Sequence, residues 1–181
     1  MHIKDAQQDF RFSFFAGATG LFASASVWLA AGLVGLAKSP GIGMLTLFFG
    51  GMLIYPLSLV LCRLLGRSGK QLPDNTLANL GMESTVQMLL GIIMAFALAS
   101  FRIEWFFPAM LVVIGGRYLL FATLYGLKLY WLCGGILIAA AAVLVMINAP
   151  VLWGAFVGSA IEFAFAAILY PVGRRSTAVG T

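Results

Sequence analysis

Six long apolar segments limit this chain to one kind of fold. A helix that crosses a bilayer needs roughly 20 apolar residues. Only 9% of the 181 residues are charged, against about 25% in a soluble domain, so the chain cannot cover a water-facing surface. We therefore expect an integral membrane protein with spans at about 12–36, 42–65, 76–100, 105–125, 129–147 and 151–171.

The spans should be helices, because the bilayer core offers no water to satisfy backbone polar groups. The apolar/polar alternation of a membrane-spanning barrel is absent from the sequence. No polar stretch is long enough to form a second, soluble domain. The predicted fold is all-α: an integral membrane bundle of six transmembrane helices that forms one domain over residues 1–181.

The lysine and arginine residues set the orientation of the spans. Of the 11 such residues, all except Lys38, Arg102 and Arg117 fall on one side of a six-span topology. Positive charge collects on the cytoplasmic side, so both termini are expected in the cytoplasm. The first ten residues, "MHIKDAQQDF", are expected to form a short interfacial helix. Acidic residues in this segment argue against a signal peptide.

The stretch "VVIGGRYLLF" places Arg117 inside the fourth span, where an unpaired charge costs roughly 2.5–3.5 kcal/mol. Arginine does not lose its charge in proteins. Apart from tyrosine, cysteine and Arg63 at the very end of the second span, the only other ionisable groups inside spans are Glu83 and Glu162. All three lie at similar depth in the cytoplasmic half, with Arg117 roughly 12 Å from the end of its span. We predict that Arg117 contacts Glu162, Glu83 or both.

Helical spacing predicts that these side chains face protein. Gln87 lies four residues after Glu83, hence on the same face. Glu162 shares its face with Gly158 and Ala166, and small residues mark faces where membrane helices approach closely. Tyr118 and Tyr55 are the expected neighbours of this polar centre.

Two functional hypotheses follow, with a third that is weaker. The leading hypothesis is a small transporter-like or ligand-binding protein. It would couple the binding of a small polar or ionic solute to protonation of Glu83. The residues expected to bind the solute are Arg117, Glu162, Glu83 and Gln87. The competing one is a non-catalytic structural or accessory subunit, in which the Arg/Glu pair only fixes helix packing. A lipid-modifying enzyme ranks third, because the chain has no nucleophile or metal set.

Other patterns mainly exclude functions. The net charge of +5 is a topology signal here and does not indicate nucleic acid. Cys62 and Cys133 have no metal-binding spacing, and His2 is the single histidine, near the terminus. No phosphate loop or dinucleotide motif is present, so we expect no enzyme activity, no cofactor and no metal. Membrane lipids are expected partners, and the sequence leaves a homo-oligomer open.

The chain resembles an uncharacterised family of small bacterial multi-pass membrane proteins. The resemblance rests on "IKDAQQDFRF", "GGMLIYPLS", "LLGRSGK", "ESTVQ" and above all "RIEWFFPAMLVVIGGRYLLFATLYGLKLYW". It covers most of the chain up to about the fifth span. The resemblance implies a bacterial inner-membrane location, and it assigns no activity or functional residue.

Overall fold

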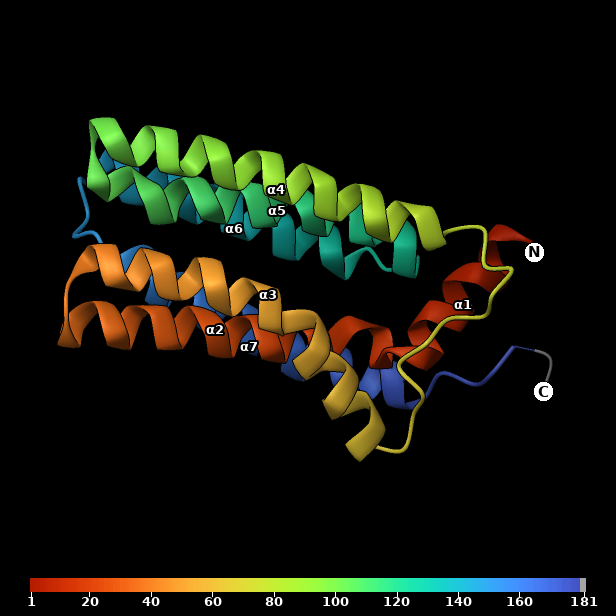
Figure 1. Cartoon of the computed structure of the whole chain (residues 1–181). Coiled ribbons are helices and arrows are strands. Elements are labelled where there is room, and N and C mark those ends of the chain that lie inside the picture. The colour runs from red at the N-terminus through yellow and green to blue at the C-terminus, as the bar shows by residue number, and fades with distance from the viewer. Residues whose placement is uncertain (180–181) are drawn as a thin grey trace.

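Figure 1 shows the computed structural model, which describes residues 1–179. This part of the chain contains no strand. Two short 3-10 turns, Phe15–Gly17 and Ile103–Trp105, precede the second and fifth α-helices. The seven α-helices are α1 (Ile3–Ser13), α2 (Ala18–Ala37), α3 (Pro40–Leu64), α4 (Ala78–Phe101), α5 (Phe106–Tyr125), α6 (Leu129–Met146) and α7 (Trp153–Arg174).

The predicted fold class is confirmed. The six helices α2 to α7, counted with their 3-10 turns, are long and apolar enough to cross a membrane. Their ends lie within a few residues of the predicted spans. The two termini lie at the same end of the bundle (Figure 1), which we call the termini end.

The six spanning helices form two groups of three. α2 packs against α3 and α7, and α5 packs against α4 and α6. Contacts of α7 with α5 and α6 join the groups, as the two layers in Figure 1 show. The first group holds α2, α3 and α7, and the second holds α4, α5 and α6. α3 and α4 are not among the closely packed helix pairs.

α3 and α4 approach at one end and separate toward the other. At the end away from the termini, Phe48 of α3 meets Phe96 of α4 edge to face, with ring centroids 6.0 Å apart. Phe96 also contacts Phe106, at 4.9 Å. Pro56 lies inside α3, and proline bends a helix because it removes a backbone donor. Toward the termini end α3 turns away from α4 (Figure 1), so the distance between the two helices increases in that direction.

A strained turn joins α1 to α2. Phe15 and Ala16 have positive φ angles of 51° and 54°, which non-glycine residues adopt only where the surroundings enforce them. Gly17 follows with a φ of 82°, and a Cβ there would overlap the Tyr130 hydroxyl. That hydroxyl donates to the Ala16 carbonyl oxygen at 2.8 Å. The turn is thus held from outside by α6.

Arg67, in the loop between α3 and α4, also contacts this turn. Its guanidinium donates to the carbonyl oxygens of Gly173 at 2.9 Å, Arg174 at 3.2 Å and Phe12. The charge also lies over the Phe15 ring, 4.1 Å from its centroid. In the sequence Arg67 is evident only as a topology signal, and its contact with three segments is not.

α1 is tied to the same loop through a buried carboxylate. Asp9 is 5% exposed and accepts hydrogen bonds from the Leu72 N–H at 2.8 Å and the Asn75 side-chain amide at 2.6 Å. The Asn75 amide also donates to the Ala6 carbonyl oxygen at 3.1 Å. The predicted N-terminal helix is therefore present, and it packs on the loop and on the ends of the spanning helices.

Candidate functional site

A cavity of about 630 Å³ lies between the two groups of helices. This volume falls in the range of small-molecule sites, about 300–1,000 Å³. Residues of α2 and α3 line one wall, and those of α4 and α5 line the other. Phe10 of α1 and Phe14, the residue after α1, lie at the termini end. The wall is mainly aliphatic and aromatic, with scattered hydroxyl and amide groups: Ser24, Tyr55, Ser58, Gln71, Thr85, Tyr118 and Tyr125.

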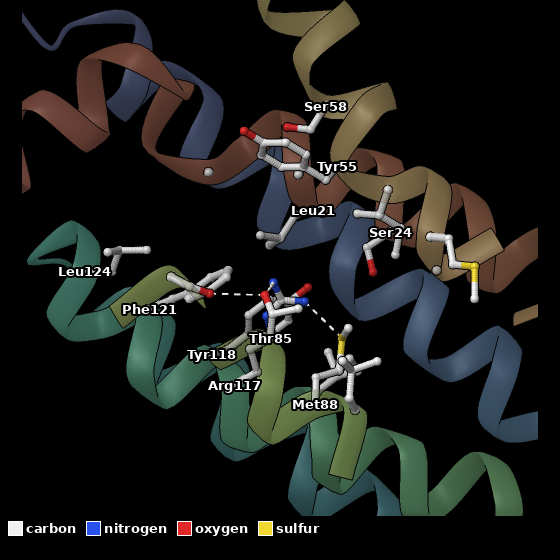
Figure 2. A pocket seen from close by; sticks show the side chains of 18 of the residues that line it. Leu21, Ser24, Tyr55, Ser58, Thr85, Met88, Arg117, Tyr118, Phe121 and Leu124 are labelled. Atoms are coloured by element: carbon white, nitrogen blue, oxygen red, sulfur yellow. Dashed lines mark hydrogen bonds between the residues drawn. The ribbon is translucent and has the colours of Figure 1, made fainter. Parts of the chain in front are cut away.

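Arg117 is the one charged residue among the described residues that line this cavity. Its Nη1 donates to the Met88 sulfur at 3.0 Å and its Nη2 to the Thr85 hydroxyl at 3.4 Å. The guanidinium also lies over the Phe121 ring, 5.1 Å from the centroid. Figure 2 shows the side chain reaching from α5 into the pocket. A thioether is a weak acceptor, so the charge is held by neutral groups.

The predicted ion pair of Arg117 with Glu162 or Glu83 is not formed. Within residues 1–179 the ion pair present is Arg102–Glu104, at 3.7 Å, in the exposed connection between α4 and α5. Glu83 is exposed, so the prediction that it faces the interior is wrong. α4 packs mainly on α5 and is oriented so that Thr85 and Met88 reach the guanidinium. Glu83 then lies on the outer surface of the helix.

Glu162 faces protein as predicted, with no exposed surface. Its Oε1 accepts a hydrogen bond from the Tyr118 hydroxyl at 2.6 Å, and the Ser24 hydroxyl lies close to the carboxyl group. Tyr118 was predicted as a neighbour of the polar centre, and the structure makes it the direct partner of Glu162. Glu162 itself does not line the cavity.

Three buried side-chain atoms within residues 1–179 have no hydrogen-bond partner in the protein: Gln87 Oε1, Arg117 Nε and Glu162 Oε2. Buried polar atoms are nearly always hydrogen-bonded. These three belong to residues that the sequence analysis selected. Gln87 lies against Gly116 of α5, one residue before Arg117. Tyr55, the sixth predicted residue, is 61% exposed and borders the cavity on α3.

The direct contacts of Arg117, which are Thr85, Met88 and Phe121, were not among the predicted partners. Carboxylates were expected, because a buried cation is usually matched by an opposite charge. Helical spacing shows which of these residues share a helix face, but it does not show which helix that face meets. Thr85 and Met88 are three residues apart on α4, and Phe121 is four residues after Arg117, so each set shares one face of its helix.

Replacing Tyr118 by phenylalanine is expected to destabilise the protein by about 1–2 kcal/mol. The change removes the hydroxyl that donates to Glu162 and leaves a buried carboxyl group with less compensation. Thermal unfolding of the purified protein in detergent measures the effect. Tyr55→Phe is the matched control, because Tyr55 is exposed. Equal stability of the two variants would show that the Tyr118–Glu162 contact contributes nothing.

No group of three or more His, Cys, Asp and Glu side chains that could hold a metal ion occurs in the described part of the chain. Cys62 instead contacts the Thr19 hydroxyl, at 3.2 Å, where α2 packs on α3. What the site offers chemically is one guanidinium in a mainly apolar cavity.

Six membrane-length helices and the cavity between them define a polytopic membrane protein. Residues 3–171 match DUF7010, a family of unknown function. The chain belongs to this family, as the sequence resemblance to an uncharacterised family of membrane proteins suggested. No curated protein and no solved structure matches it. A functional conclusion must therefore come from the site itself.

Proposed function

We propose that this protein is a small transporter-like or ligand-binding membrane protein whose ligand occupies the cavity beside Arg117. The observation that carries the proposal is a guanidinium in the wall of a cavity, held by a sulfur, a hydroxyl and an aromatic ring. Such a cation favours an anionic group, because a carboxylate or phosphate can accept two parallel hydrogen bonds from the guanidinium.

The same geometry argues against the competing hypothesis of a structural subunit. That hypothesis depended on a direct Arg/Glu pair that fixes helix packing. Arg117 and Glu162 each have a different partner, and both retain an unpartnered atom. A contact that served only to lock helices would satisfy these groups. Coupling to protonation of Glu83 loses its basis, since Glu83 is exposed.

The proposed location is the bacterial plasma membrane with both termini in the cytoplasm. It is supported by the distribution of lysine and arginine and by the placement of both termini at one end of the bundle (Figure 1). The cavity would then open in the cytoplasmic half of the membrane.

The test is a thermal-shift screen of the purified protein against small carboxylates, phosphates and sulfonates at several pH values. A ligand at about 100 times its Kd should stabilise the wild type by about 2.7 kcal/mol. The stabilisation should be lost in Arg117→Gln and kept in two controls. Arg102→Gln removes a charge from the exposed pair, and Glu83→Gln changes an exposed residue of α4. If no anion stabilises the wild type more than Arg117→Gln, the proposal is wrong.

A further inference from the structure

We infer that the ligand is a single-chain amphiphile with a carboxylate head group, a molecule of the fatty-acid class, which enters from the membrane between α3 and α4. The inference rests on the proposed function and names the chemical class of its ligand. Three features of the cavity carry it: a single positive charge, an apolar closed end and an opening that faces lipid.

The charge of the cavity matches a monoanion. Arg117 is the one charged residue of the described lining, and its Nε has no partner in the protein. A carboxylate fits the planar fork of a guanidinium with two parallel hydrogen bonds. A phosphate monoester carries up to two negative charges at neutral pH, and the lining offers no second cation to balance them. Glu162 is outside the lining, hydrogen-bonded to Tyr118.

The part of the cavity beyond Arg117 suits an apolar tail. From Arg117 to Phe106, at the other end of α5, the helix rises by about 16 Å. The lining at that level consists of Trp28, Leu47, Phe48, Ile92, Phe106 and Met110. The aromatic contacts of Phe96 with Phe48 and Phe106 close this end. A small polar solute would leave this apolar wall uncovered, whereas an alkyl chain would cover it with van der Waals contacts.

The opening of the cavity faces the side of the bundle. Met52 and Tyr55 on α3 and Met82 on α4 line the cavity and are each 60% exposed or more. α3 and α4 are not among the closely packed helix pairs, and α3 turns away from α4 toward the termini end (Figure 1). Met52, Tyr55 and Met82 lie within the two helical segments, Pro40–Leu64 and Ala78–Phe101, that are long and apolar enough to cross a membrane. Lipid chains would therefore surround the opening. A molecule dissolved in the bilayer can therefore reach Arg117 without crossing water.

A second cavity provides an internal comparison. It measures about 600 Å³ and lies between α2, α3 and α7, lined by residues such as Phe22, Leu61 and Phe163. Its described lining contains no Lys, Arg, Asp or Glu. Acyl chains could fill this crevice without recognition of a head group. Selection for a carboxylate should therefore be confined to the cavity that contains Arg117.

The experiment is photocrosslinking of the full chain in lipid nanodiscs with a long-chain fatty acid that carries a diazirine on its tail. Unlabelled competitors are the same fatty acid without the diazirine, its methyl ester, the phosphate monoester of the matching alcohol, and hexanoate. We expect the free acid to compete about tenfold or more better than the ester and better than the phosphate. Hexanoate should compete weakly. The labelled residues should lie on α3, α4 or α5, or at Trp28 of α2.

Two kinds of variant distinguish recognition of the carboxylate head group from binding of the alkyl tail. Arg117→Gln should make acid and ester compete equally. Gly51→Leu and Gly81→Leu place a side chain at cavity-lining positions where an added Cβ meets no atom within 4 Å, and both should reduce labelling about tenfold. Gly41→Leu and Gly135→Leu are the matched controls, because these glycines are equally open and lie outside the lining. Leucine is a better helix former than glycine, so all four variants should fold.

Several results would overturn the inference. Equal competition by acid and ester in the wild type would show that the head group is not recognised. Labelling that maps to the second cavity, or that Gly51→Leu and Gly81→Leu leave unchanged, would exclude this site. Stronger competition by the phosphate monoester than by the free acid would show that the head group is not a carboxylate. If hexanoate binds in an Arg117-dependent manner and the long chain does not, the inference fails while the proposed function stands. If no anion binds in an Arg117-dependent manner, both fail.

Discussion

Gly173→Ala is expected to destabilise the protein by about 3 kcal/mol or more, which is large for the addition of one methyl group. Gly173 lies in the last turn of α7, and a Cβ at this position would overlap the backbone carbonyl group of Phe15. A flexible side chain could turn away from such an overlap, but a backbone cannot. Phe15 is already in the left-handed region, so it has little conformational freedom with which to respond.

The effect should be measured as the loss of unfolding free energy in mixed micelles with increasing SDS. Gly135→Ala is the matched control, because Gly135 lies on a spanning helix and an added Cβ meets no atom within 4 Å. Alanine is the better helix former, so the control should be neutral or slightly stabilised. Similar stability of the two variants would mean that α7 and the Phe15–Gly17 turn do not meet closely in the folded protein.

The positions of the six spanning helices could be predicted from the sequence alone. Bilayer thickness fixes the length of each spanning element, and the need to hydrogen-bond every backbone polar group makes each one a helix. Both constraints leave their mark as a long apolar segment, which can be recognised from composition alone. The burial of Glu162 could be predicted for a related reason. Gly158 and Ala166 mark a face of α7 that lies against other helices, and Glu162 lies on that face with no exposed surface.

The partners of the buried charges could not be predicted in the same way. Counting residues along a span predicts the depth of a side chain, and that argument placed Arg117, Glu83 and Glu162 at similar depth. The direction of a side chain depends on the rotation of its helix, which changes by about 100° with each residue. Arg117 therefore reaches Thr85 and Met88 on α4, while its neighbour Tyr118 reaches Glu162 on α7.

The conformation of the turn between α1 and α2 could not be predicted from the sequence for another reason. Phe15 and Ala16 have no intrinsic preference for positive φ angles, and the strain is offset by distant groups. Those groups are the Tyr130 hydroxyl and the Arg67 guanidinium. Nothing in the local pattern "FFAGA" indicates that residues more than 50 and 110 positions away complete this turn.

Arg67→Gln is expected to cost about 2–4 kcal/mol of unfolding free energy, since several carbonyl oxygens at the termini end lose their donor at once. The guanidinium joins the end of α1, the end of α7 and the aromatic ring of Phe15. Arg67→Lys should recover little of the loss, because an ammonium lacks the planar fork that reaches several acceptors. The measurement is SDS-induced unfolding of both variants beside the wild type.

The control separates this packing role from the contribution of Arg67 to membrane orientation. Arg63→Gln removes a positive charge from the same side of the bundle, and Arg63 is exposed. If Arg67 served only as a topology signal, the Arg63 and Arg67 variants would be equally stable, and Arg67→Lys would behave as wild type. If it holds the strained turn, only the Arg67 variants lose stability. Amide hydrogen exchange should then accelerate at residues 12–17 and at the end of α7, the two segments that the guanidinium joins.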